Sequence, residues 1–89
     1  MNVIISVIGK DRIGIIADVC QLLAGMQVNV IDISQTIMGE YFTMIMRANV
    51  ASANICVDEM VVILRNKGKE LGLEIDLRSE EIFNAMHRI

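Results

Sequence analysis

The residue pattern best suited to chemistry lies near the start of the chain, where an apolar run gives way to Gly-Lys-Asp-Arg-Ile-Gly at residues 9–14. This polar loop, bracketed by two glycines, leads directly into a segment with helical apolar periodicity. A helix N-terminus leaves backbone N–H groups without intrahelical acceptors, and its dipole favours a negative group there. The pattern therefore predicts a binding site for a small anionic group.

The sequence gives less support for a catalytic site or a metal site. The single histidine, His87, stands near the C-terminus, and one histidine without matching cysteines or clustered acids makes no metal site. The serines have no histidine in prospect that could activate them as nucleophiles. We therefore expect binding rather than catalysis, with no metal and no cofactor.

The composition bounds the class of protein. Eighty-nine residues predict one domain over 1–89, and 54% of them are hydrophobic while 21% are charged. This is more apolar material than one small core hides, which favours a symmetric homodimer. The net charge of −3 and the three aromatic residues, one Tyr and two Phe, argue against nucleic acid and against an anionic membrane surface as partners.

The cysteines and the N-terminal sequence predict a location. Cys20 and Cys56 lie far apart, each within an apolar-periodic pattern, which is typical of buried free thiols in a reducing compartment. The chain starts without a basic leader, and no apolar run reaches membrane-spanning length. We expect a cytoplasmic protein that does not enter a membrane.

Hydrophobic periodicity predicts the elements that must position the loop. Strict alternation or short apolar runs indicate strands, and apolar residues spaced i, i+3, i+4, i+7 indicate helices. A turn at 39–40 joins two of the strands as a hairpin, and residues 65–70 form the solvated end of a helix. The expected strands are 2–8, 28–38, 41–49 and 73–78, and the expected helices are 14–24, one between 54 and Gly72, and a short one after 79–81.

This β-α-β-β-α-β order is the ferredoxin-like plan, an α+β fold in which a four-stranded antiparallel sheet carries two helices on one face, here with a short C-terminal helix added. The first strand is apolar on both alternating sets, so we expect it to be central and covered on both faces. The helix-free face is too apolar to be left wholly wet, which again suggests a second copy. The fold serves many functions and decides none by itself.

Three interpretations of the loop remain open from the residues alone. A structural one has Asp11 capping the helix, Gly14 relieving crowding and Asn29 satisfying a turn. An acylphosphatase-like enzyme would use Arg12 to hold a phosphate, although the loop lacks that family's longer glycine-rich cradle. A protein-interaction module would keep the fold and the dimer without any ligand.

A family resemblance favours ligand binding. Residues 9–17, Gly-Lys-Asp-Arg-Ile-Gly-Ile-Ile-Ala, followed by Asn-Val-Ile-Asp-Ile at 29–33, resemble the ACT domain, and the resemblance covers nearly the whole chain. Segments 32–36 and 83–89 look most like the small stand-alone bacterial and archaeal ACT proteins, relatives of the glycine-cleavage-system repressor type. The resemblance implies a noncatalytic regulatory module that binds a small molecule, usually an amino acid, and signals in trans to a partner protein.

The resemblance also implies where the ligand lies. Two domains join side by side, and the ligand sits between the first loop of one copy and a strand or helix of the other. Asp11 would engage polar groups of the ligand, the backbone over 12–15 would receive its carboxylate, and Asn29 would bind its amino or side-chain group across the interface. The implied ligand-binding residues are Asp11, Arg12, Ile13, Gly14, Ile15 and Asn29.

Overall fold

The computed structural model describes residues 2–10 and 13–81. Its elements follow the predicted β-α-β-β-α-β order, and the C-terminal helix expected after 79–81 falls, from residue 82 onward, outside the described residues. Neither helix in the described part of the chain is long and apolar enough to cross a membrane. The elements are β1 (Asn2–Lys10), α1 (Ile15–Gly25), β2 (Asn29–Met38), β3 (Tyr41–Asn49), α2 (Val57–Leu71) and β4 (Leu73–Ser79).

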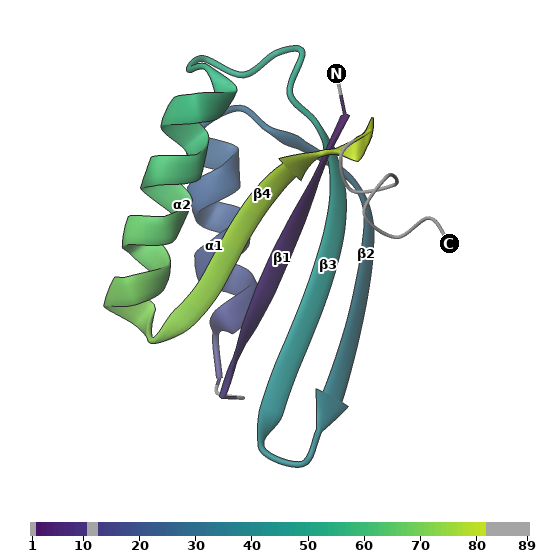
Figure 1. Ribbon diagram of the computed structural model, residues 1–89, viewed down its shortest axis with the longest axis vertical. Coiled ribbons are helices and arrows are strands. Elements are labelled where there is room, and N and C mark those ends of the chain that lie inside the picture. The colour runs from purple at the N-terminus through teal and green to yellow at the C-terminus, as the bar shows by residue number, and fades with distance from the viewer. Residues whose placement is uncertain (1, 11–12, 82–89) are drawn as a thin grey trace.

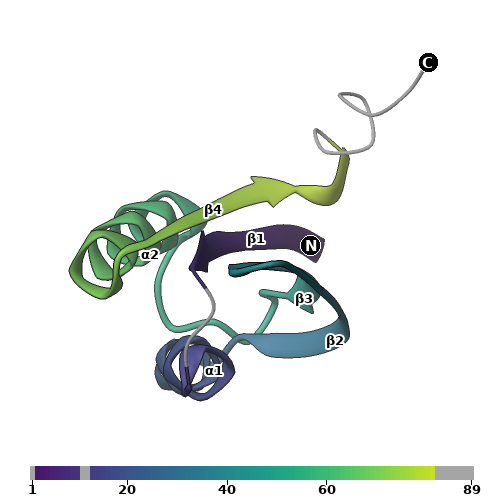
Figure 2. The same ribbon diagram turned by 90° about the horizontal axis from the view of Figure 1, so that it is seen from below.

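The four strands form one sheet in the order β2-β3-β1-β4, with every neighbouring pair antiparallel. β1 and β3 are therefore central, while β2 and β4 are the two edges. Figure 1 shows α1 behind the sheet and α2 beside β4, and Figure 2 shows α1 under the sheet with α2 alongside the β4 edge. The predicted ferredoxin-like fold is confirmed.

The core lies between the helices and one face of the sheet. Alternate residues of a strand point to opposite faces, so only every second side chain of β1 and β3 enters it. The helices add one stripe each, at the spacing of a helical turn. The main core side chains are Val3, Ile5, Val7, Ile15, Val19, Leu23, Phe42, Met44, Met46, Ala48, Met60, Leu64, Leu73, Ile75 and Leu77.

β1 is longer than predicted, and one of its faces is less buried than predicted. It continues through Gly9, which pairs with Phe42 on β3 and Leu73 on β4, and it ends at Lys10. On the helix-free face Ile8 is exposed, so the expected cover on both faces is wrong for this end of the strand. Because both described helices pack on one face, no helix of the described residues covers the other face.

The helix ends follow the predictions in part. Gly72 ends α2 in the left-handed region with φ 74°, as expected of a C-cap glycine. Gly25 is instead the last residue of α1, and the positive φ of that turn falls on Gln27. The expected burial of the thiols is also wrong: Cys56 precedes the first turn of α2 and is exposed, and Cys20 is half-buried.

α2 approaches β4 closely at Gly68. A Cβ at this position would lie 2.7 Å from the Leu73 carbonyl oxygen and 3.3 Å from the Ile75 backbone nitrogen. Both neighbours are backbone atoms, which cannot rotate away as a side chain could. The missing side chain therefore fixes how near the helix lies to the edge strand.

Gly68→Ala should destabilise the protein although alanine is the better helix former. The added methyl group forces α2 away from β4, and this overpacking exceeds the gain in helix propensity of about 1 kcal/mol. We expect the free energy of unfolding in urea to fall by about 1–2 kcal/mol. Gly25→Ala is the control, because a Cβ there would meet no described atom within 4 Å beyond its chain neighbours and its own helix. Equal or greater stability of Gly68→Ala would contradict the close packing.

Candidate ligand-binding site

The first loop joins the end of β1 to the start of α1. Asp11 and Arg12 lie outside the described residues, so their predicted roles remain predictions. Ile13 is 99% exposed, and Gly14 follows it with φ 92° as the residue that precedes the helix. The loop therefore brings an apolar side chain and a left-handed glycine to the helix entrance.

The N-terminus of α1 offers backbone donors. The first intrahelical bond runs from the Asp18 N–H to the Gly14 carbonyl oxygen at 2.9 Å. The N–H groups of residues 15–17 precede that bond and have no acceptor one turn earlier in the helix. Gly14 has no side chain with which to cap them. This end of α1 can thus donate to a carboxylate, although Asp18 places a negative charge in the same first turn.

Asn29 lies at the opposite end of the sheet. It pairs with Asn49 on β3, and Asn49 pairs with Asn2 at the beginning of β1, whereas the first loop follows the end of β1. The length of β1 separates these ends, which is roughly 26 Å at the usual rise per residue. Within one chain the structure therefore does not bring Asn29 to the other predicted site residues.

Exposed apolar side chains gather on β2 and its hairpin. The alternation of the sequence predicts Ile31, Ile33 and Ile37 on one face of β2, and the register confirms this for two of them, because Ile33 lies opposite Met46 and Ile37 opposite Phe42, both on the core face of β3. Ile31 falls instead at a register shift between Val30 and Asp32, where it has no partner on β3. Ile33 and Ile37 are nevertheless 47% and 58% exposed. Their partners Met46 and Phe42 on β3 are buried, so the exposure arises because β2 is the edge strand of the sheet. The β2–β3 hairpin also extends past the ends of both helices (Figure 1). The apolar excess seen in the composition is thus concentrated at one edge of the sheet.

Sequence reasoning missed a groove of about 570 Å³ between α2 and β4. Arg65 and Lys69 border it from the helix, and Glu74 and Asp76 border it from the strand. The sequence contained half of the signal, because the alternation of β4 places Glu74, Asp76 and Arg78 on one face. Residues 65–70 resembled an ordinary solvated helix end, and their position beside β4 depends on tertiary packing.

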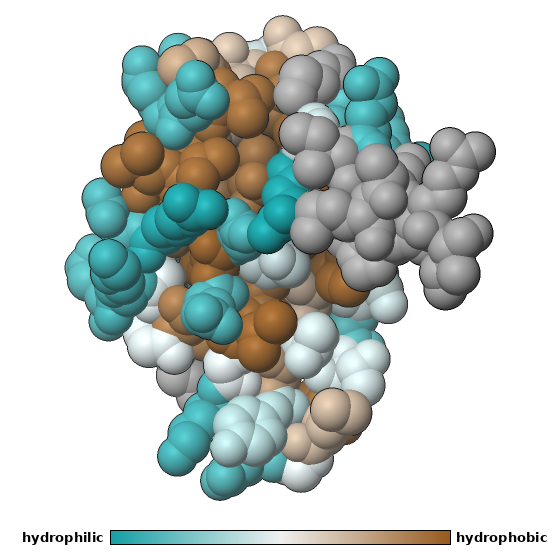
Figure 3. Space-filling model, in the orientation of Figure 1, coloured by the Kyte–Doolittle hydropathy of each residue, from teal (hydrophilic) through white to brown (hydrophobic). Residues whose placement is uncertain are grey.

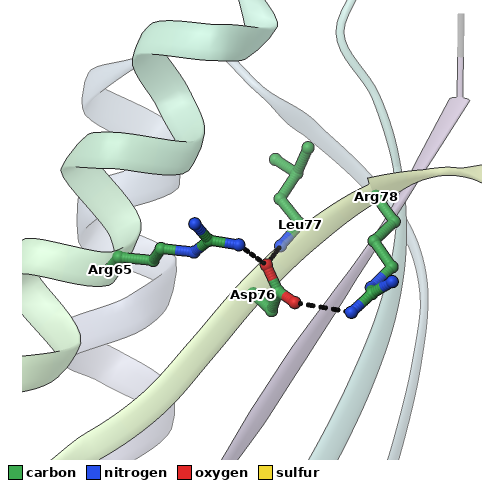
Figure 4. A network of polar contacts seen from close by, with 4 residues as sticks. All are labelled: Arg65, Asp76, Leu77 and Arg78. Atoms are coloured by element: carbon green, nitrogen blue, oxygen red, sulfur yellow. Dashed lines mark hydrogen bonds and ion pairs between the residues drawn. The ribbon is translucent and has the colours of Figure 1, made fainter.

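Asp76 is the centre of the polar network in this groove (Figure 4). Its Oδ1 accepts the Leu77 N–H at 3.0 Å and an Arg65 N–H at 3.2 Å, and its Oδ2 accepts from Arg78 at 3.2 Å. Burial raises the pKa of Asp76, but the Leu77 N–H and the two guanidinium groups outweigh that effect and hold the pKa below its usual value. The carboxylate therefore stays charged at neutral pH.

Comparison with known proteins identifies the family. A family model for the ACT domain matches residues 2–78, and a UPF0237 protein from Clostridium acetobutylicum is 51% identical over 89 residues, the full length of both chains. The chain belongs to the ACT domain family. An ACT domain protein from Streptococcus pneumoniae shares the fold, with a TM-score of 0.82 and 36% identity over 98% of each chain.

The resemblance drawn from residues 9–17 and 29–33 is therefore confirmed. A second structural neighbour is described as a glycine cleavage system transcriptional repressor, with a TM-score of 0.73 and 24% identity. This likeness covers 86% of the present chain but 44% of that chain, and it concerns the fold alone. ACT domains are regulatory domains that bind small molecules, so the coarse functional prediction is confirmed as well.

Metal chemistry finds no support in the described part of the chain. No group of three or more His, Cys, Asp or Glu side chains there is arranged to hold a metal ion. His87 and the Arg12 of the acylphosphatase-like alternative both lie outside the described residues. What the described loop provides is a set of backbone donors beside an exposed apolar residue.

Gly14→Ala should lower the free energy of unfolding by about 1 kcal/mol, because an L-residue with a side chain is strained at positive φ. A Cβ at Gly14 would meet no described atom within 4 Å beyond its chain neighbours, so crowding by the described residues adds nothing to this strain. The free energy of unfolding should therefore fall even without any ligand present. Urea unfolding of Gly14→Ala beside Gly25→Ala measures it, and equal stabilities would contradict the strain.

Proposed function

We propose that this ACT domain is a noncatalytic sensor that binds an amino acid as a homodimer in the cytoplasm and passes its occupancy to a partner protein. The observation that supports this most directly is the entrance to α1, where backbone N–H groups without helical acceptors follow an exposed turn at Ile13 and Gly14. A carboxylate fits such donors because the helix dipole and the N–H groups act on it together.

The homodimer is supported by the β2 edge. Every residue of this strand is exposed except the half-buried Val30, and an edge strand carries backbone groups that can pair with another strand. Exposed Ile31, Ile33 and Ile37 add apolar area, worth about 25 cal/mol for each Å² removed from water. A two-fold axis beside β2 would pair the two copies antiparallel and extend the sheet.

The same symmetry supports a ligand site shared between copies. Met38, Tyr41 and Lys10 lie at one level of the sheet, because Met38 pairs with Tyr41 and Tyr41 pairs with Lys10. Antiparallel pairing of two β2 strands sets Asn29 of one copy beside the Met38 end of the other. This is also the end at which the other copy's first loop begins. Pairing thus removes the separation along the strands that a single chain imposes.

The amino acid is tested by thermal unfolding against each of the twenty amino acids. A ligand at a hundred times its Kd adds about 2.7 kcal/mol of stability, which raises the Tm of a domain of this size by about 10–20 °C. We expect one amino acid to give such a saturable rise and Asn29→Ala to weaken the apparent affinity at least tenfold. Asn66→Ala, an exposed amide on α2, is the control and should respond like the parent.

A flat screen would instead favour the alternative of a protein-interaction module without a ligand. An unchanged response of Asn29→Ala would contradict the shared site but not the sensor. These two results therefore separate the ligand from its proposed location.

The dimer is tested by light scattering of Ile33→Lys. A charge on the exposed side of β2 should repel its copy across the axis and cannot be buried there without cost, so the mass should fall from two chains to one. Val62→Lys is the matched control, because Val62 is also a branched apolar residue and exposed but lies on α2. A wild-type protein of one chain, or an Ile33→Lys variant that stays at two, would contradict pairing through β2.

A further inference from the structure

The two edges of the sheet are treated differently, and we propose that Gly68, Asp76 and Arg65 close the β4 edge against a strand of another copy. Association would then be confined to β2 and would stop at two chains. This inference rests on the β2 pairing of the proposed function. The surface concerned is the second edge of the sheet, β4, which the fold prevents from pairing.

An edge strand turns the N–H and C=O of every second residue away from its only neighbour. In β4 these residues are the odd-numbered ones, since the Leu77 N–H donates to the Asp76 side chain instead of to β1. The Leu73 oxygen and the Ile75 nitrogen likewise face α2, because both lie next to the Cβ position of Gly68. Unpaired backbone groups at Leu73, Ile75 and Leu77 would otherwise form a template for a new strand.

The helix covers the first half of this edge. Gly68 lets α2 come so close that its backbone stands against Leu73 and Ile75, at 2.7 and 3.3 Å from the Cβ position. No strand can enter between the two without moving the helix. Gly68 and the core residue Leu64 lie one turn apart, so the same packing that buries the core also blocks this half of the edge.

The Asp76 network covers the second half. Asp76 takes the outward N–H of Leu77, and Arg65 reaches from α2 across the edge to the same carboxylate at 3.2 Å (Figure 4). A strand approaching Leu77 would have to displace the guanidinium group of Arg65 and compete for the N–H. Charged side chains on an edge prevent pairing in this way, because burying them without partners is costly.

The surface around the network explains why such a closure is needed. Val62 on α2 is 57% exposed, and Figure 3 shows hydrophobic side chains gathered over α2 and β4 with a band of hydrophilic side chains between them. Without the network this region would offer apolar area beside free backbone groups. Two open edges on one chain allow β2 to pair on one side and β4 on the other, which produces an open array instead of a closed dimer.

No comparable closure occurs among the described residues of β2. The ion pair between Asp32 and Arg47, at 2.8 Å, joins β2 to β3 across the sheet and does not cross the free side of β2. The apolar side chains Ile33 and Ile37 stay exposed on that strand. The charge arrangement therefore distinguishes the two edges and leaves β2 for a second copy.

The test is the mass of Asp76→Thr, measured by sedimentation velocity over a hundredfold range of protein concentration. Threonine removes the carboxylate and suits a strand, so it frees the half of the edge at Leu77 that α2 does not cover. We expect the weight-average mass to rise above two chains as the concentration increases. Glu70→Gln is the control, because it removes one negative charge from the exposed Lys67–Glu70 pair and should stay at two chains. An Asp76→Thr protein that folds cooperatively and stays at two chains at every concentration would overturn the proposal.

Two further variants test the same closure independently of Asp76→Thr alone and of the wild-type dimer. Asp76→Thr combined with Arg65→Ala opens the same edge without leaving the Arg65 guanidinium group deprived of its carboxylate partner, so its mass should also rise even if Asp76→Thr alone does not fold. Ile33→Lys combined with Asp76→Thr should form two chains through β4, whereas Ile33→Lys alone should be a single chain. If the wild type is itself a single chain and Asp76→Thr forms two, the closure of β4 stands and the proposed β2 dimer fails.

Discussion

The structure depends on the packing of both helices against a single face of the sheet. Only every second side chain of β1 and β3 turns toward the helices, so these two strands contribute half of their residues to the core. This arrangement fixes the distance between α2 and β4 through Gly68, and it places the N-terminus of α1 next to the loop that follows β1. Among the described residues, neither helix covers the opposite face of the sheet or the β2 edge.

The candidate site follows from this packing. α1 is held by its core stripe of Ile15, Val19 and Leu23, and its first turn therefore presents backbone donors at a fixed place beside the sheet. Nothing in the described part of the site requires a reactive side chain. The family's regulatory role is consistent with such a site, because donors from the backbone can hold a small molecule without altering it.

The two edges of the sheet differ in how their outward backbone groups are covered. At β4, backbone contact with α2 and the charges around Asp76 satisfy or shield the outward groups. At β2, the edge position leaves the isoleucines exposed although their partners on β3 are buried. In the proposed dimer, the same hydrophobic effect that builds the core favours pairing at β2, while the contacts at β4 oppose pairing there.

The sequence by itself determined the element order, the core faces of β3 and β4 and the family, because alternation, helical spacing and the loop at 9–14 are local patterns. It could not determine that Ile33 is exposed or that Cys56 precedes α2. Tertiary structure also decided that Arg65 meets Asp76, eleven residues later in the chain. Periodicity reports which face a side chain takes, whereas burial and partnership depend on which elements lie against that face and how far they extend.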